Sequence, residues 1–350
     1  MTIRLTHIYL TNFRNFAHSD FPIGPDLTLI IGQNARGKTS LLEGIYCTVY
    51  GTGFRESREV ELVRWEADAN LIEGTFSDGD HDNLFQLKLQ QTSETKVQKS
   101  FYVNKTKKTS TQYRTLQTHA VLFAPEQIQI ITGSPSRRRR YFDEVLSAID
   151  LDYKKKLHNY ERALRRRNKI LEVFEDEIQL LSEIAYWNAY LIEQASYITH
   201  ARQQYIAFLN SHPEVNGKEF TITYHKDEFS QSRLIEAQTR EYRFRRTLIG
   251  PQKDDFEVFL HEPKVKEVSL YGSRSEQRMA IFWLKLNELL YFEQASHAKP
   301  ILLLDDIFSE LDDRNRELVM KVIREYQTIA TTTEEEIKDL SQMPEEVIRL

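Results

Sequence analysis

The chain has 350 residues, of which 28% are charged and 40% are hydrophobic, and its formal net charge is −5. This composition is ordinary for a globular protein with one large core and a smaller domain. No apolar run approaches the roughly 20 residues of a membrane span, and the first residues lack the apolar stretch of a signal peptide, so we expect a cytoplasmic protein. The single cysteine, Cys47, excludes a disulfide framework and a thiolate metal site, and is expected to pack as a small apolar residue.

The first part of the chain is predicted to be rich in β-strands. Apolar and polar residues alternate over 3–10, 72–76, 85–89 and 97–103, which is typical of half-exposed strands. Turn-forming residues such as those at 78–80 separate them. Residues 120–123 form a continuous apolar run, which indicates a short buried strand.

A glycine-rich loop at 32–39 follows the apolar run 27–31 and precedes a helix-like segment. Strand, glycine loop and helix in this order are typical of a phosphate-binding loop, in which backbone N–H groups and the helix N-terminus surround a phosphate. Gly32 and Gly37 allow the backbone to approach closely. Lys38 can reach the β- and γ-phosphate oxygens, and the Thr39 hydroxyl can bind Mg²⁺. The pattern therefore predicts a nucleotide site.

From residue 136 onward the pattern becomes helical. Apolar residues recur every three or four positions over 153–174 and 178–209, which predicts two long helices joined by an acidic turn. We expect them to form an antiparallel arm, because the heptad pattern is too short and irregular for an extended coiled coil. One apolar stripe of the second helix comprises Leu180, Leu181, Ile184, Trp187, Leu191 and Ile198.

After Gly250-Pro251, predicted strands (256–260, 301–304 and 328–331) alternate with predicted helices (274–292 and 312–326). This alternation predicts a parallel sheet that completes the domain begun at the N-terminus. The strand at 301–304 ends in Asp305 and Asp306. At such a strand end the first acid can hold the Mg²⁺ that Thr39 also contacts, and the second can orient or deprotonate an attacking water.

A short turn at 269–273 opens another long helix. Its free N–H groups would form a second anion site, which suggests that each nucleotide is closed by a second subunit. The alternative is an ordinary helix cap, with Ser273 or Ser275 as the N-cap and Glu276 as the acid of the first turn.

Basic residues are concentrated at 137–140, 154–169 and 240–246, whereas many carboxylates lie at 305–313 and 334–336. Such segregation gives one face a positive field although the total charge is negative. Arginine runs contact DNA phosphates without reading sequence; the alternatives are a solvated helical face or an interdomain ion-pair network. The candidate DNA contacts are Arg137, Arg138, Arg139, Arg140, Arg165, Arg166 and Arg167.

Together these motifs resemble the ABC-type ATPase head of SMC-like proteins and, more narrowly, the RecF family. The general resemblance rests on the phosphate loop, the strand at 301–306, SELD at 309–312 and SRSEQR at 273–278. The narrower resemblance rests on five further segments that span nearly the whole chain: LTNFRNF at 10–16, FRESRE at 54–59, LFAPE at 122–126, GSPSRRRR at 133–140 and TLIGPQKDD at 247–255.

The resemblance implies an α/β fold: an ABC-type P-loop ATPase head of mixed β-sheets and helices with an inserted helical arm. The implied domains are 1–133 for the N-terminal part of the head, 134–243 for the arm, and 244–350 for the C-terminal part with the signature turn and Walker B strand. It also implies that ATP and Mg²⁺ drive a head-to-tail homodimer that clamps gapped or duplex DNA, and that slow hydrolysis releases it. RecR- and RecO-type partners would then help RecA to load.

The resemblance also implies roles for individual residues. Thr39 and Asp305 would hold the metal, and Lys38 and Asp306 would be catalytic. The loop with Ser309 and Asp312 would cross the dimer interface. The signature turn that contacts the γ-phosphate bound by the partner would be Ser273, Arg274, Ser275 and Glu276. The expected ATP contacts are Gly32, Gln33, Asn34, Ala35, Arg36, Gly37, Lys38, Thr39, Ser40 and Arg14.

Three features depart from the family pattern. Ser275 stands where the signature turn usually has glycine, Gln252-Lys253 stands where His-Arg is usual, and no switch histidine follows the strand at 328–331. Two other functions stay open: a nucleotide-gated scaffold without significant hydrolysis, and another SMC-like or anti-phage ATPase. The second acid, Asp306, favours hydrolysis over the scaffold, and the match along the arm favours RecF over the other ATPases.

Overall fold

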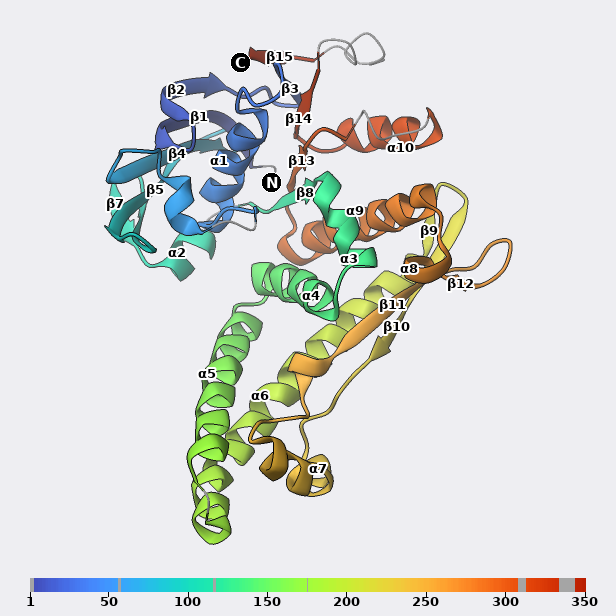
Figure 1. Cartoon of the computed structure of the whole chain (residues 1–350). Coiled ribbons are helices and arrows are strands. Elements are labelled where there is room, and N and C mark those ends of the chain that lie inside the picture. The colour runs from blue at the N-terminus through green and yellow to red at the C-terminus, as the bar shows by residue number, and fades with distance from the viewer. Residues whose placement is uncertain (1–2, 56–57, 116–117, 175, 308–312, 334–343) are drawn as a thin grey trace. The chain divides into compact units, whose positions relative to one another are not determined.

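The computed structural model describes residues 3–55, 58–115, 118–174, 176–307, 313–333 and 344–350. Contacts divide the chain into two compact units, one of Met1–Glu126 with Glu288–Leu350 and one of Gln127–Asn287 (Figure 1). The second boundary falls inside helix α9 (Arg274–Ser296). Within the part of the chain that the structure describes, no helix is long and apolar enough to cross a membrane.

The first unit contains an antiparallel sheet of the order β2-β1-β4-β5-β6-β7. The strict alternation of buried and half-buried residues along β4 is what the sequence pattern predicted for strands in this region. The bounds of these strands are Arg4–Phe13 (β1), Phe16–Pro22 (β2), Ala69–Ser77 (β4), Asp82–Ser93 (β5), Lys96–Val103 (β6) and Thr106–Lys108 (β7).

The same unit contains a parallel sheet of the order β15-β3-β14-β13-β8. All its pairings are parallel, so the sheet predicted from the strand–helix alternation near the C-terminus is confirmed for 301–304 and 328–331. The bounds are Leu27–Ile31 (β3), Ala120–Phe123 (β8), Ile301–Leu304 (β13), Thr328–Thr332 (β14) and Glu346–Arg349 (β15). The short helices of this unit are η1 (Glu59–Leu62), α2 (Ser110–Thr115) and α10 (Asp313–Ile323), and η2 (Pro125–Ile128) lies at its boundary.

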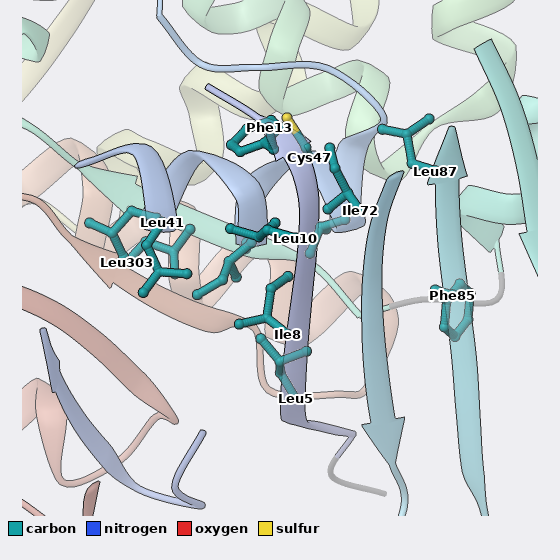
Figure 2. Close-up of a cluster of buried hydrophobic side chains, with 14 of the residues drawn as sticks. Leu5, Ile8, Leu10, Phe13, Leu41, Cys47, Ile72, Phe85, Leu87 and Leu303 are labelled. Atoms are coloured by element: carbon teal, nitrogen blue, oxygen red, sulfur yellow. The ribbon is translucent and has the colours of Figure 1, made fainter. Parts of the chain in front are cut away.

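Helix α1 (Lys38–Tyr50) packs into one apolar core with strands of both sheets. Figure 2 shows Leu41 and Cys47 of this helix together with Leu10 of β1 and Leu303 of β13. Cys47 is fully buried, as predicted, and burial raises the pKa of its thiol well above the ordinary value. The core therefore fixes the start of α1 relative to the ends of the parallel strands.

A buried glutamine connects the two sheets. Gln327, directly before β14, donates its amide hydrogens to the carbonyls of Leu5 (2.7 Å) and Gly24 (2.8 Å). Its side-chain oxygen accepts the backbone N–H of Leu5 on β1 (2.9 Å). Buried backbone groups are costly when they lack partners, and this one side chain supplies partners to three of them.

The second unit is mostly helical. Helices α5 and α6 are the two long helices that the periodicity predicted, and they pack against each other (Figure 1). The helical bounds are Gln129–Thr132 (α3), Pro135–Ile149 (α4), Leu151–Val173 (α5), Glu177–Ser211 (α6), Gln231–Phe244 (α7), Pro251–Lys253 (η3) and Val268–Tyr271 (α8). The predicted stripe of α6 is wrong at Leu181, which is 43% exposed, because a residue next to Leu180 is turned about 100° away around the helix.

A small antiparallel sheet of the order β12-β11-β10-β9 also belongs to the second unit. The strand predicted at 256–260 is therefore not part of the parallel sheet: β11 pairs with β10, with Phe220 opposite Leu260. As a result the unit includes residues 244–287, which were expected to belong to the C-terminal part of the ATPase head. The bounds are Glu214–Val215 (β9), Lys218–His225 (β10), Asp255–Leu260 (β11) and Lys266–Glu267 (β12).

We predict that Gln327→Met lowers the free energy of unfolding by about 2–4 kcal/mol, since three backbone groups lose their partner. Urea denaturation followed by circular dichroism measures the change. The matched control is Gln90→Met, because the Gln90 amide donates to an exposed carbonyl, that of Asp68 (3.1 Å). Equal effects of the two substitutions would contradict the role assigned to Gln327.

Candidate functional site

The glycine loop lies between β3 and α1, in the order that the sequence predicted. Gly37 has a φ of +111°, a conformation that residues with a Cβ rarely adopt. A Cβ at this position would lie 2.5 Å from the side chain of Asn15. Asn15 also donates a hydrogen bond to the carbonyl of Arg36 (3.2 Å). The turn between β1 and β2 thus supports the loop from one side, and only glycine fits there.

The Lys38 side chain folds over the loop. Its Nζ donates to the carbonyl of Gly32 (2.7 Å) and lies 3.5 Å from Oδ1 of Asn34. Lys38 is largely buried, although it also lines a cavity of about 1090 Å³. A cationic group that is tethered at a glycine loop and borders a cavity is suited to an anionic ligand.

The structure brings together the two residues that the sequence predicted as metal ligands. The hydroxyl of Thr39 donates to Oδ1 of Asp305 (2.9 Å), and the hydroxyl of Thr331 donates to the same oxygen (3.0 Å). Burial raises the pKa of the Asp305 carboxyl, although these hydrogen bonds act in the opposite direction. Thr331 was missed in the sequence; a polar residue inside the fully buried strand β14 was the signal that could have identified it.

Asp306 lies beside this pair. Its backbone N–H donates to the Thr331 hydroxyl (2.8 Å), and its φ is +49°. Asp306 lines the same cavity as Lys38 and Thr39. The structure therefore gathers the two acids and the phosphate loop in one site of the first unit, as the order of the motifs predicted.

Arg14, which was expected near the nucleotide, is held by an acid of α1. Its guanidinium donates to both carboxylate oxygens of Glu43, at 2.8 and 3.1 Å. Glu43 is fully buried and also accepts the backbone N–H of Arg55 (3.3 Å). No pattern in the sequence identified Glu43, because it lies within an apolar helix far from Arg14 along the chain.

The cavity itself is formed within the first unit. Besides the residues already named, it is lined by Arg58, directly before η1, and by Arg64 and Trp65 in the segment that follows η1. Its volume of about 1090 Å³ slightly exceeds the usual range of ligand pockets, which is about 300–1,000 Å³. The site can therefore accept a ligand larger than a phosphate ion.

The predicted signature turn belongs to the second unit and forms a helix cap. The Glu276 carboxylate accepts the backbone N–H of Ser273 (2.8 Å), and the Ser273 hydroxyl accepts the N–H of Glu276 (3.3 Å). This reciprocal arrangement is a capping box. Partial burial opposes ionisation of Glu276, but hydrogen bonds from Lys266 and Ser273 outweigh it and lower the pKa to about 2. Arg274 and Ser275 are exposed.

The other half of the predicted interface, Ser309 and Asp312, lies outside the described residues.

The predicted DNA contacts divide into exposed and internally bonded arginines. Arg140, Arg165 and Arg166 are exposed, and Arg137 is half-buried. Arg138 forms two hydrogen bonds with the Asp255 carboxylate, at 2.6 and 2.9 Å, and Arg139 donates to the carbonyl of Asp254 (2.8 Å). These two guanidiniums are thus directed to partners inside the second unit.

The prediction that Arg167 contacts DNA is wrong. This residue is 1% exposed, and its guanidinium bonds to Glu241 (2.7 Å), Thr247 (2.8 Å) and Asn188 (2.7 Å). A buried guanidinium with this set of partners is not available to a DNA phosphate. Arg167 therefore belongs to an ion-pair network within the second unit and not to an interdomain one, because residue 167 lies on the inner face of α5, whereas 165 and 166 lie on its outer face.

We predict that Asp305→Asn raises the free energy of unfolding of the ligand-free protein by about 1 kcal/mol at neutral pH. Because burial raises the pKa of Asp305, its ionised form disfavours the folded state. Asparagine retains the oxygen that accepts from Thr39 and Thr331 but carries no charge. The gain should vanish below about pH 4, where aspartate is protonated in both states; urea denaturation across pH measures it.

Asp255→Asn is the matched control and should have the opposite sign. Burial opposes ionisation of Asp255, but the hydrogen bond from Arg138 outweighs it and lowers the pKa of the carboxyl. Removing this charge should lower stability at neutral pH. A loss of stability in Asp305→Asn of the same size would contradict the assignment of Asp305 as an unfavourable buried charge.

The model of the family described as "RecF/RecN/SMC N terminal domain" matches residues 4–348. A protein of Exiguobacterium sp. named DNA replication and repair protein RecF is 32% identical to this chain over an alignment of 357 residues including gaps. The alignment covers 95% of this chain and 92% of that protein. The protein of the same name from Lysinibacillus sphaericus is 30% identical over 354 residues, with coverage of 95% and 93%.

Solved structures agree with these relatives. The chain is 27% identical to the recombination mediator protein RecF-ATPrS in the RecFOR pathway, with a TM-score of 0.88 and coverage of 100% of this chain and 96% of that one. An Smc head domain from Pyrococcus furiosus, 16% identical, covers 97% and 92% with a TM-score of 0.53 and shows the fold alone. The predicted α/β fold with an ATPase-type head and a helical arm is confirmed, and the chain belongs to the RecF family.

Proposed function

We propose that this protein binds ATP with Mg²⁺ and acts on DNA in replication and recombinational repair. The observation that carries the proposal is the hydrogen bond of 2.9 Å between Thr39 and Asp305 at the glycine loop, since it joins both halves of a phosphate-loop nucleotide site. A RecF structure described as RecF-ATP in the RecFOR pathway, 27% identical with a TM-score of 0.86, supports ATP as the ligand. The single-cysteine composition suits work in the cytoplasm.

The residues present fit a magnesium ion. Mg²⁺ prefers oxygen ligands and is usually held by one or two protein groups together with phosphates of the substrate. The Thr39 hydroxyl and the Asp305 carboxylate provide two such oxygens side by side. When bound, the ion would neutralise charge on the β- and γ-phosphates. It would also compensate the charge of the buried Asp305.

Residues of the chain itself would bind the phosphates and accept the proton. The amides of the loop Gly32–Lys38 would bind the phosphates, with the Lys38 ammonium on the β- and γ-oxygens. Asp306 would accept a proton from the water that attacks the γ-phosphorus, whose bond to the β–γ bridging oxygen breaks. The products would be ADP and phosphate.

The predicted signature turn at the start of α9 would be closed onto the nucleotide of a second copy of the chain. Ser273, Arg274, Ser275 and Glu276 would approach the γ-phosphate held by the partner, and the loop with Ser309 and Asp312 would cross the interface. Lys266 holds the Glu276 carboxylate, with both oxygens at 2.9 Å from its Nζ. That acid would therefore order the turn, while its exposed neighbours meet the phosphate.

Exposed basic residues of α5 support binding of gapped or duplex DNA. Lys155, Arg162 and Arg166 are exposed and spaced by seven and four residues, so they share one face of the helix. The proposed DNA contact therefore uses this exposed face of α5 and not the buried Arg167. RecR- and RecO-type partners would cooperate with the ATP-bound dimer, as the RecFOR description of the related structures suggests.

We predict that Lys38→Met abolishes ATP-induced dimerisation, because the γ-phosphate loses its main positive partner. Light scattering with and without ATP and Mg²⁺ measures the dimer.

Asp306→Asn should retain ATP binding and the dimer but slow hydrolysis by at least about 100-fold. If phosphate release in Asp306→Asn equals that of the parent, Asp306 is not the base; if the parent itself releases none, the scaffold function holds instead.

We predict that Arg162→Ala and Arg166→Ala each weaken binding to gapped duplex DNA to a similar extent for unrelated sequences. Each should also reduce the slope of log K against log salt by about 1, since one phosphate contact is lost. Fluorescence anisotropy over a salt series measures both. Lys88→Ala, an exposed residue of β5, is the control and should leave the slope unchanged.

A further inference from the structure

Trp65 is an exposed aromatic residue that the proposed chemistry does not use. Its side chain is 87% exposed, whereas Trp283 is fully buried and Trp187 is partly buried. Tryptophan in a folded protein usually buries most of its ring and is rarely left in water. The same side chain lines the cavity that contains Lys38, Thr39 and Asp306. An exposed indole in a ligand cavity offers an unused stacking surface.

The backbone around Trp65 is held firmly. The N–H of Ala67 donates to the carbonyl of Arg64 (3.0 Å), which closes a β-turn with Trp65 and Glu66 at its centre. Glu66 has a φ of +66°. The residues before the turn, Leu62 and Val63, are buried in the core of the first unit. The turn therefore projects Trp65 from a fixed base.

The turn is also connected to the phosphate loop. The N–H of Arg14 donates to the carbonyl of Leu62 (3.1 Å), and the N–H of Arg64 donates to the carbonyl of Asn12 (2.7 Å). Next to Arg14, Asn15 donates to the carbonyl of Arg36 in the phosphate loop (3.2 Å). A short series of backbone and side-chain hydrogen bonds thus links the loop that would hold the phosphates to the turn that carries the indole.

We propose that Trp65 is the stacking platform for the base of the bound nucleotide; this rests on the proposed ATP function. A nucleoside triphosphate held by its phosphates at the loop must place its base elsewhere in the same cavity. An indole offers the largest aromatic face among side chains, and stacking on it is tolerant of base identity. The ligand class is therefore a nucleoside triphosphate, with the base contributing affinity that a bare polyphosphate lacks.

Binding of two ligands to matched variants tests the proposal. ATP carries a base, whereas inorganic tripolyphosphate carries the same three phosphates and neither sugar nor base. In calorimetric titrations of the full chain with Mg²⁺, Trp65→Ala should weaken ATP binding about tenfold and leave tripolyphosphate binding unchanged. Trp65→Phe should restore most of the ATP affinity. Tyr186→Ala, at an exposed aromatic of α6, is the control and should change neither.

Trp65 fluorescence provides a second readout. Because the other two tryptophans are buried or partly buried, Trp65 should account for most of the emission that acrylamide quenches. ATP should protect this emission, and tripolyphosphate should not. The difference spectrum between the parent and Trp65→Phe identifies the contribution of this ring.

Several outcomes would overturn the assignment. Equal losses of ATP and tripolyphosphate affinity in Trp65→Ala would mean that the ring only supports the loop. Unchanged ATP affinity together with weaker DNA binding or dimerisation would assign Trp65 to a macromolecular partner. Undiminished binding of both ligands to Lys38→Met would instead contradict the phosphate site itself. This result distinguishes failure of the proposed ATP function from failure of the proposed stacking by Trp65.

Discussion

The buried carboxylate of Asp305 is the contact on which the arrangement of the site depends. It accepts hydrogen bonds from Thr39 at the start of α1 and from Thr331 in β14, so one oxygen joins the loop helix to two neighbouring strands. A charged group in this position is unfavourable for the folded protein by itself. The proposed ATP and Mg²⁺ would relieve that cost, so stability and ligand binding oppose each other at this residue.

Helix α1 connects the site to the rest of the first unit. Its apolar face packs between strands of both sheets, while the buried Glu43 on the same helix holds Arg14. Arg14 lies in the turn whose neighbours contact both the phosphate loop and the segment before Trp65. A rigid core with preorganised loops can thus position a phosphate site and a base site from segments that are distant in sequence.

Arginine serves two different purposes in the second unit. Arg202 and Arg167 lie in its interior, where they pair with Asp254 and with Glu241 at 2.7 Å. Arg162 and Arg166 project from α5 into solvent. A run of arginines in the sequence does not distinguish these cases, because adjacent helical residues differ by about 100° in direction and only the packed structure shows which side is covered. For the same reason β11 was assigned to the wrong sheet. Its alternation of apolar and polar residues predicts a strand but does not determine which strand it pairs with.

By itself the sequence determined the features that depend on near neighbours in the chain. These are the strand, glycine loop and helix at 27–50, the acids at the end of β13, the capping box of α9 and the long helices of the second unit, which follow from local spacing and composition. Only the tertiary structure decided the roles of Thr331, Glu43 and Gln327, whose partners Asp305, Arg14 and Leu5 are distant in sequence. It likewise decided that Arg167 is internal and that Trp65 faces the cavity. Contacts between distant residues depend on how sheets and helices pack, and no local spacing pattern records that packing.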